Sequence, residues 1–198
     1  MSQFLDALKN RRSIYALGRN VNLSQEEIST TIKEAVKLSP TDFNAQTTRA
    51  VILFDGAHEK LWKIVEAALK PVTPAEAFSN TQEKLAGFKN AYGTVLFFKE
   101  KDTVKNLQEQ FELYANNFPI WAEQSNGIAQ ANTWTALAAE GLGANLQHYN
   151  PLIDAEVTST WNIPANWELR GQLVFGSKEA EAGEKEFMND EDRFKVIK

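Results

Sequence analysis

The sequence predicts one domain of mixed α/β or α+β class. Segments with helical spacing of apolar residues alternate with a few short apolar runs typical of buried strands. The 198 residues are enough to bury a sizeable core. No internal repeat, low-complexity tract or linker divides the chain, so we expect one domain over residues 1–198, with a charged arm from residue 176.

The N-terminal part is expected to hold two helices joined by an extended segment. Ser2 can cap a helix over residues 2–10, and residues 11–20 are then extended or looped. Ser24 and Glu27 form a capping box for a second helix, which runs to about Leu38. The turn residues at 39–44 stop it.

The middle of the chain reads as strands and helices in alternation. The apolar run at 49–54 predicts a strand buried on both faces, closed by Asp55 and Gly56. Further elements are expected as helices at 61–69, 74–88 and 103–114, with a buried strand at 93–98 between the last two.

A long helix over residues 119–141 carries few charges, so we expect it to be buried nearly all round, with one side against a partner subunit. Gly141 and Gly143 supply its C-terminal cap and turn. Beyond it the sequence predicts a strand at 144–148, a helix at 151–161 and a strand at 169–175.

Bulk composition excludes several classes of function. A net charge of −5 argues against a general nucleic-acid or membrane binder. The chain has no cysteine, which excludes disulfides, thiolate nucleophiles and Cys-ligated metals. No apolar run reaches transmembrane length and no signal peptide is evident, so the cytoplasm is the expected location.

Arg11, Arg12 and Ser13 form a cationic cluster at the end of the first predicted helix. Guanidinium forks suit phosphate oxygens because several fixed N–H donors meet several acceptors. The alternative is that the two arginines favour the helix dipole and pair with carboxylates.

Asn44 and Gln46 place two carboxamides one residue apart, before a predicted strand. A carboxamide offers a donor and an acceptor together, which suits the edge of a heterocycle. The alternative is capping of the local turn.

The two histidines give little support to metal or hydrolytic chemistry. His58 is expected at the surface, in a turn before a helix, and His148 lies in a polar stretch before Pro151. They are far apart and lack metal-ligand spacing, so we expect no metal site. Glycine-rich nucleotide loops and a serine nucleophile elbow are absent from the sequence.

Four motifs in order resemble the nitroreductase family: Arg11-Arg12-Ser13-Ile14, Ser39-Pro40, Asn44-x-Gln46 before a strand, and a long helix ending Gly141-Leu-Gly143. The stretch 141–151 is similar to small bacterial and fungal members related to fatty-acid-repression-type proteins. The resemblance covers nearly the whole chain. It implies an α+β homodimer with a central mixed sheet surrounded by helices, the long helix at the dimer interface, and FMN reduced there by NADH or NADPH.

The resemblance also implies roles for individual residues. The phosphate and ribityl end of FMN would contact the cationic cluster and Lys185 of the arm. Ser125 of the long helix would approach from the partner subunit, and the small residues and Trp134 of that helix would pack the dimer. No protein side chain is expected to act as the catalyst. The expected cofactor-binding residues are Arg11, Arg12, Ser13, Tyr15, Asn44, Gln46, Ser125, Leu146, Gln147, His148 and Lys185, of which Asn44, Gln46 and residues 146–148 would face the flavin ring.

Two positions depart from the family pattern. Tyr15 stands where many members carry a cation near the flavin N1/O2 edge, so the anionic reduced flavin would be stabilised less. Thr47 and Thr48 replace the frequent Pro-Trp, which alters the loop over the ring.

Three hypotheses follow. The first is an FMN-dependent NAD(P)H oxidoreductase reducing nitroaromatics or quinones in ping-pong order. The second, motivated by Tyr15, is a weakly catalytic flavin-binding protein for flavin storage or redox signalling. The third is a dimeric anion-binding interaction domain without flavin.

Overall fold

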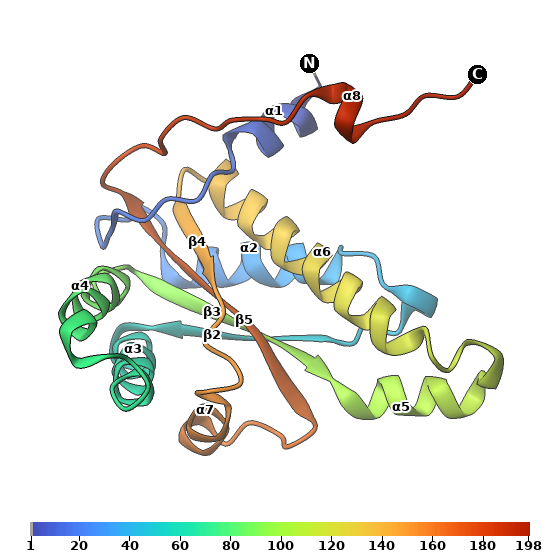
Figure 1. The fold of residues 1–198 in the computed structure, drawn as a ribbon, viewed down its shortest axis with the longest axis horizontal. Helices are drawn as coiled ribbons and strands as arrows, with labels where there is room; N and C mark the ends of the chain where they lie inside the picture. The colour runs from blue at the N-terminus through green and yellow to red at the C-terminus, as the bar shows by residue number, and fades with distance from the viewer. Residues whose placement is uncertain (1) are drawn as a thin grey trace.

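The computed structural model describes residues 2–198 as a central β-sheet with helices on both faces (Figure 1). The α+β class expected from the sequence is confirmed. The helices are α1 (Gln3–Asn10), α2 (Gln25–Lys37), α3 (Asp55–Leu69), α4 (Phe78–Lys89), α5 (Lys101–Gln110), α6 (Phe118–Ala139), α7 (Asp154–Trp161) and α8 (Asp190–Arg193). The strands are β1 (Leu17–Gly18), β2 (Thr48–Phe54), β3 (Gly93–Glu100), β4 (Gly143–Gln147) and β5 (Trp167–Lys178), and the short 3₁₀ turns are η1 (Asp42–Asn44), η2 (Ala75–Ala77) and η3 (Glu112–Tyr114).

The last strand in the chain, β5, organises the sheet. The order β1-β5-β3-β2 places β5 against both β1 and β3, and β4 also pairs with β5. All four strand pairings are antiparallel. The parallel component of the expected mixed sheet is a single bridge between Ser13 and Ala144.

Alternate residues of β3 and β5 supply two cores on opposite faces of the sheet. Leu96, Phe98 and Val174 face the core that contains α3, α4 and α7. Val95, Phe97, Leu173 and Phe175 pack with residues of α2 and α6 on the other face. The predicted burial of the 93–98 run is therefore confirmed, because β3 is covered on both faces.

The strand predicted at residues 49–54, which is β2, is less buried than expected. β2 contacts both cores, through Val51 on one face and Ala50 and Ile52 on the other, yet these side chains stay half-buried. The reason is position, since β2 lies at the edge of the sheet and pairs with β3 alone among the described strands.

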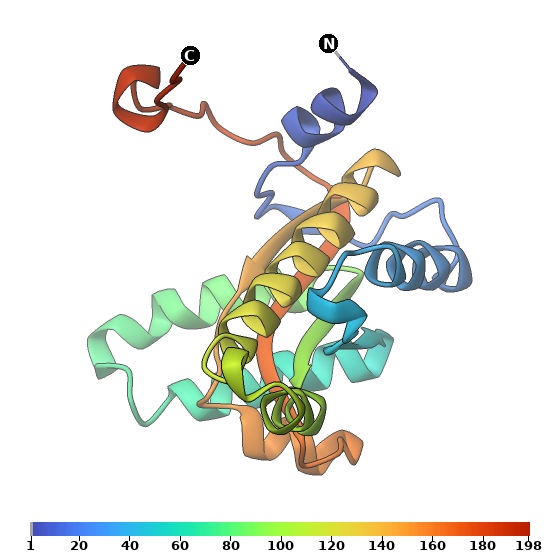
Figure 2. The same ribbon diagram turned by 90° about the vertical axis from the view of Figure 1, so that its right-hand side faces the viewer.

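Within the single chain α6 is buried on one side only, and the partner subunit expected on its other side stays a prediction. α6 crosses the outside of the sheet (Figure 2), and only one side of it packs inward. Its opposite side leaves Ile120 56% and Ile128 39% exposed. The expected end at Gly141 is confirmed, since Gly141 has φ of 84° and the amide of Leu142 bonds back to the carbonyl of Leu137 at 3.0 Å.

The capping box of α2 is present in full. The Ser24 hydroxyl accepts from the amide of Glu27 at 3.2 Å, and the Glu27 carboxylate accepts from the amide of Ser24 at 2.8 Å. We expect Ser24→Ala to lower the free energy of unfolding by about 1 kcal/mol, because the amide of Glu27 loses its acceptor and the Glu27 carboxylate loses the Ser24 hydroxyl. Urea unfolding measures this change, and Thr30→Ala, an exposed threonine later in α2, is the control. An unchanged midpoint in Ser24→Ala would contradict the prediction.

Both chain ends lie at the same end of the molecule. The segment after β5 leaves the sheet toward the end that carries α1, as both views show (Figures 1 and 2). Within residues 2–198, no helix combines the length and apolar character needed to cross a membrane.

Candidate functional site

The segment of residues 11–15 is held against β4. It begins where α1 ends, at Arg11, whose extended backbone turns the chain out of the helix. Ser13 forms the parallel bridge with Ala144, and the amide of Ile14 donates to the carbonyl of Ala144 at 2.9 Å. These bonds fix the backbone from which the cationic cluster extends.

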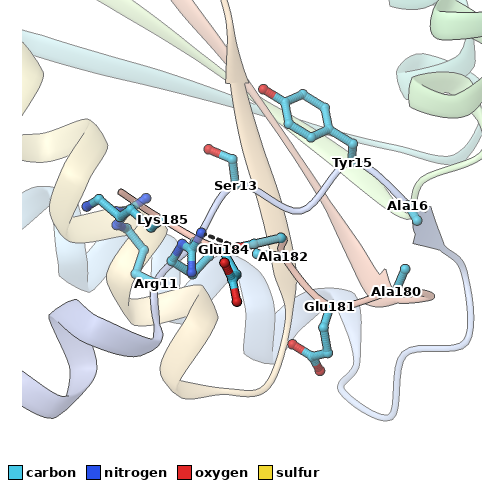
Figure 3. A pocket seen from close by; sticks show the side chains of 11 residues that line it. Arg11, Ser13, Tyr15, Ala16, Ala180, Glu181, Ala182, Glu184 and Lys185 are labelled. Carbon is cyan, nitrogen blue, oxygen red and sulfur yellow. Dashed lines mark hydrogen bonds between the residues drawn. The ribbon is translucent and has the colours of Figure 1, made fainter. Parts of the chain in front are cut away.

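A cleft of about 590 Å³ opens between this segment and the chain beyond β5 (Figure 3). Arg11, Arg12, Ser13 and Tyr15 line one side, and residues 180–185 line the other. The structure therefore brings Lys185 to the cationic cluster across more than 170 positions of sequence. In the view of Figure 3 Arg11 and Lys185 appear at one end of the cleft and Glu181 at the other.

The two arginines of the cluster contact different parts of the structure. The Arg11 guanidinium lies over the Trp134 ring of α6, 4.5 Å from its centroid. Arg12 donates to the carbonyl of Gly183 at 2.7 Å and so ties the N-terminal segment to the arm. Neither arginine makes an ion pair among the described residues, so the expected alternative of carboxylate pairing is wrong here.

The end of β4 carries the residues expected near the flavin ring. Gln147 is buried and its Nε2 donates to Asn145 Oδ1 at 2.8 Å, while Leu146 is half-buried and His148 is exposed. Backbone bonds at Ala144 therefore join the strand that carries these residues to the segment that carries the cationic cluster.

Asn44 and Gln46 lie in a strained turn elsewhere on the molecule. Phe43, Asn44 and Gln46 have φ of 49°, 53° and 50°, a region that non-glycine residues seldom occupy. Both carboxamide side chains are exposed. Ser125 of α6 is close to this turn, because its hydroxyl donates to Asp42 Oδ1 at 3.1 Å.

The predicted site residues thus form two groups. Arg11, Arg12, Ser13, Tyr15 and Lys185 share one cleft, with Leu146, Gln147 and His148 on the strand bonded to it. Asn44, Gln46 and Ser125 form the second group, at the η1 turn, and none of them lines the cleft. Along α6, Ser125 and Trp134 are nine residues apart, a rise of roughly 13 Å.

A cage of ion pairs joins α6 to the sheet. Lys99 Nζ lies 2.6 Å from a Glu123 oxygen and 2.9 Å from Glu168, and Arg170 contacts the same two carboxylates. Burial opposes the charged amine, but the hydrogen bonds that it donates to Glu123 and Glu168 raise the pKa of Lys99. Two cations and two anions balance one another, so we assign this cage to structure rather than to ligand binding.

The expectation that His58 lies at the surface is wrong. His58 belongs to α3, is fully buried, and its Nδ1 lies 2.9 Å from the Thr94 hydroxyl. Burial lowers the pKa of His58 to about 4, with a further contribution from the charge of Arg19. The imidazole is therefore neutral at pH 7. Among the described residues, no group of three His, Asp or Glu side chains could hold a metal ion.

Sequence reasoning missed the stacking role of Trp134 and gave Asn145 no role. Asn145 donates to the carbonyl of Ile14 at 2.8 Å and accepts from Gln147. No local pattern marks either residue, because the contacts of Trp134 with Arg11 and of Asn145 with Ile14 join segments at least 120 positions apart.

The chain is similar to known nitroreductases in both sequence and structure. The model of the nitroreductase family matches residues 8–177. The nitroreductase CinD from Lactococcus lactis, solved in complex with nicotinic acid, is 60% identical with a TM-score of 0.93, over 99% of this chain and 100% of that chain. It has also been solved with chloramphenicol and with 4-nitrophenol.

Two other proteins are similar over nearly their whole length. The protein HBN1 of Saccharomyces cerevisiae is 36% identical over 193 residues, which is 96% of each chain. A Desulfovibrio desulfuricans protein solved in complex with FMN has the same fold, with a TM-score of 0.74 at 18% identity over 100% of this chain and 98% of that chain.

Proposed function

The chain belongs to the nitroreductase family, and we propose that it is an FMN-dependent NAD(P)H oxidoreductase that reduces nitroaromatics or quinones. FMN is the cofactor. The nitrophenol and chloramphenicol bound by the 60% identical CinD support aromatic nitro compounds as acceptors. We propose that the chain acts as one FMN-binding domain; because β5 runs to Lys178, its arm begins at residue 179 and not at residue 176 as expected.

One observation carries the proposal. Arg11, Arg12, Ser13 and Lys185 come from opposite ends of the chain and line one cleft. Three cations and a hydroxyl fit the donor set that a phosphate monoester requires, and they outnumber the two carboxylates in the lining, Glu181 and Glu184. These residues would hold the phosphate of FMN.

We further propose that two copies of the chain complete the site. Asn44 and Gln46 are exposed in a turn that does not reach the cleft of the same chain. The exposed apolar residues of α6, Ile120 and Ile128, offer a surface for a partner. A homodimer would set the amides of one protomer beside the cleft of the other.

The residues of the chain bind and orient rather than react. The arginines and Lys185 anchor the anionic end of the cofactor, and the carboxamides of Asn44 and Gln46 offer donor and acceptor groups to the polar edge of the ring. When bound, FMN supplies the two-electron hydride chemistry between NAD(P)H and the acceptor. Ping-pong order follows if both substrates use the same open face in turn. The protein needs no nucleophile, in keeping with a sequence that has no cysteine.

An absorption spectrum of the purified protein tests the proposal. We expect a yellow protein with flavin bands, which NADH or NADPH bleaches under anaerobic conditions and which 4-nitrophenol or a quinone restores. The measurement is the stoichiometric titration, followed at the flavin absorbance maximum. A colourless protein that takes up no added FMN would refute the proposed function.

One observation favours a second candidate, a flavin-binding protein with weak catalysis in storage or redox signalling. Tyr15 lines the cleft, is 60% exposed, and brings no positive charge to the place where the family often has a cation. A neutral phenol stabilises an anionic reduced flavin less than a cation does. Slow bleaching and no acceptor turnover would support this candidate, and fast turnover would exclude it.

A further inference from the structure

Asn145 is a fully buried amide that contacts both parts of the proposed flavin site. It lies in β4 with 0% of its surface exposed. Its Nδ2 donates to the carbonyl of Ile14 at 2.8 Å, and its Oδ1 accepts from Gln147 Nε2 at 2.8 Å. One side chain therefore joins the segment of the cationic cluster to the strand end expected at the ring.

The direction of this hydrogen-bond chain is fixed by its last member. A backbone carbonyl can only accept, so Asn145 must present its amino group to Ile14 and its oxygen to Gln147. Gln147 must then present its own amino group to Asn145. The backbone of residue 14 thus sets the orientation of a side chain at residue 147, through two bonds that water does not replace at these buried positions.

Asn145 also supplies the hydrogen-bond partner of the second polar backbone group of Ile14. The amide of Ile14 donates to the carbonyl of Ala144, and its carbonyl accepts from Asn145. Close packing supports this arrangement, since a Cβ added at Gly143 would approach Ile14 and Leu17 side chains to about 3.0 Å. Both polar groups of the Ile14 backbone therefore depend on two successive residues of β4.

Building on the proposed function, we propose that Asn145 is a positioning residue that couples the phosphate end of the flavin site to its ring end. With Asn145 in place, the backbone behind Arg11, Arg12 and Ser13 and the carboxamide of Gln147 have one relative arrangement. Without it, the Ile14 carbonyl and the Gln147 amino group both lose their partner, and only the bonds of Ser13 and Ile14 to Ala144 still join the two ends.

The test compares FMN with riboflavin, which has the same ring and no phosphate. Asn145→Leu keeps the volume and removes both hydrogen bonds. We expect the dissociation constant to rise about 30-fold for FMN and about 3-fold for riboflavin, because FMN uses both ends and riboflavin only one. Fluorescence titration of the apoprotein gives both constants. If Asn145 acted on stability alone, the variant would weaken the binding of both flavins by the same factor.

The matched control is Asn166→Leu. Asn166 also donates two hydrogen bonds, to Glu100 at 2.7 Å and Asp102 at 2.8 Å, but it lies before β5 and away from the cleft. We expect it to leave the preference for FMN over riboflavin unchanged. If Asn145→Leu lost affinity for both flavins by the same factor, or lost affinity for neither, the coupling role would be overturned.

A second variant keeps the test decisive if Asn145→Leu does not fold. Gln147→Met removes the ring-end partner and leaves the phosphate end intact, yet coupling predicts that the preference for FMN over riboflavin falls about threefold. An unchanged preference would overturn the proposal. The native protein separates this result from the proposed function: if it binds neither flavin the function fails, whereas intact flavin binding with unaltered variants refutes the coupling alone.

Discussion

Arg11→Ala is expected to raise the dissociation constant of FMN by about 10- to 150-fold, equivalent to about 1.5–3 kcal/mol. This is the scale of a hydrogen bond to a charged group, and the loss is confined to the phosphate end. Arg11 lies over the Trp134 ring and lines the cleft together with Lys185. The stacking holds the guanidinium before the ligand arrives, so little side-chain entropy is lost on binding.

Titration of the apoprotein with FMN and with riboflavin measures this effect. Riboflavin affinity should stay constant in Arg11→Ala, because the missing group is the phosphate. Arg19→Ala is the matched control: it removes the same charge from a guanidinium that pairs with Glu59 at 2.8 Å instead. Equal weakening of riboflavin binding and FMN binding would show that Arg11 does not act at the phosphate.

The free energy of unfolding is expected to fall by about 3 kcal/mol between pH 6.5 and pH 4 through His58 alone. Burial lowers the pKa of His58 from 6.5 to about 4 in the folded chain. Between these values the unfolded chain binds a proton that the folded chain does not. The contribution of His58 is therefore complete above pH 6.5 and is lost as the pH falls toward 4.

Urea unfolding at a series of pH values measures this slope. His58→Leu should flatten the profile in this range, because the titrating group is gone, although losing the bond to Thr94 lowers stability at every pH. His148→Gln is the control, since His148 is exposed and is the other histidine of the chain. A profile in His58→Leu that stays as steep as in the native protein would contradict the prediction.

Local signals predicted some helix ends well and others poorly, since α5 ends at Gln110 and not at residue 114 as expected. Ser24 and Glu27 fix the start of α2, and Gly141 fixes the end of α6, because each acts within four residues of sequence. The error at His58 arose from the start of α3. Asp55 and Gly56 read as a turn, yet α3 begins at Asp55 directly after β2. The spacing of His58, Leu61, Trp62 and Val65 is that of one buried helix face, and it could have revealed the buried histidine.

Only those residues of the candidate site that belong to a recognisable sequence motif were predictable. The pairing of Arg11 and Arg12 with Lys185 came from the family resemblance, and the cleft brings these residues together as expected. Trp134 beneath Arg11 carries no such signal, because the contact depends on where α6 crosses the end of α1. The contact of α6 with a partner subunit stays a prediction, because low charge indicates a helix that becomes buried but not by which chain.

The position of β5 in the chain has a consequence for biosynthesis. β1 and β4 each find their strand partner in β5, so a nascent chain that has not yet emerged to residue 178 leaves both of them unpaired. The two walls of the cleft, lined by residues 11–13, 15 and 16 on one side and 180–185 on the other, meet only after that strand docks. A ribosome-bound chain would therefore acquire its affinity for FMN last, as one of the final events of folding, and arrested chains of increasing length should begin to bind flavin abruptly once the arm has left the exit tunnel.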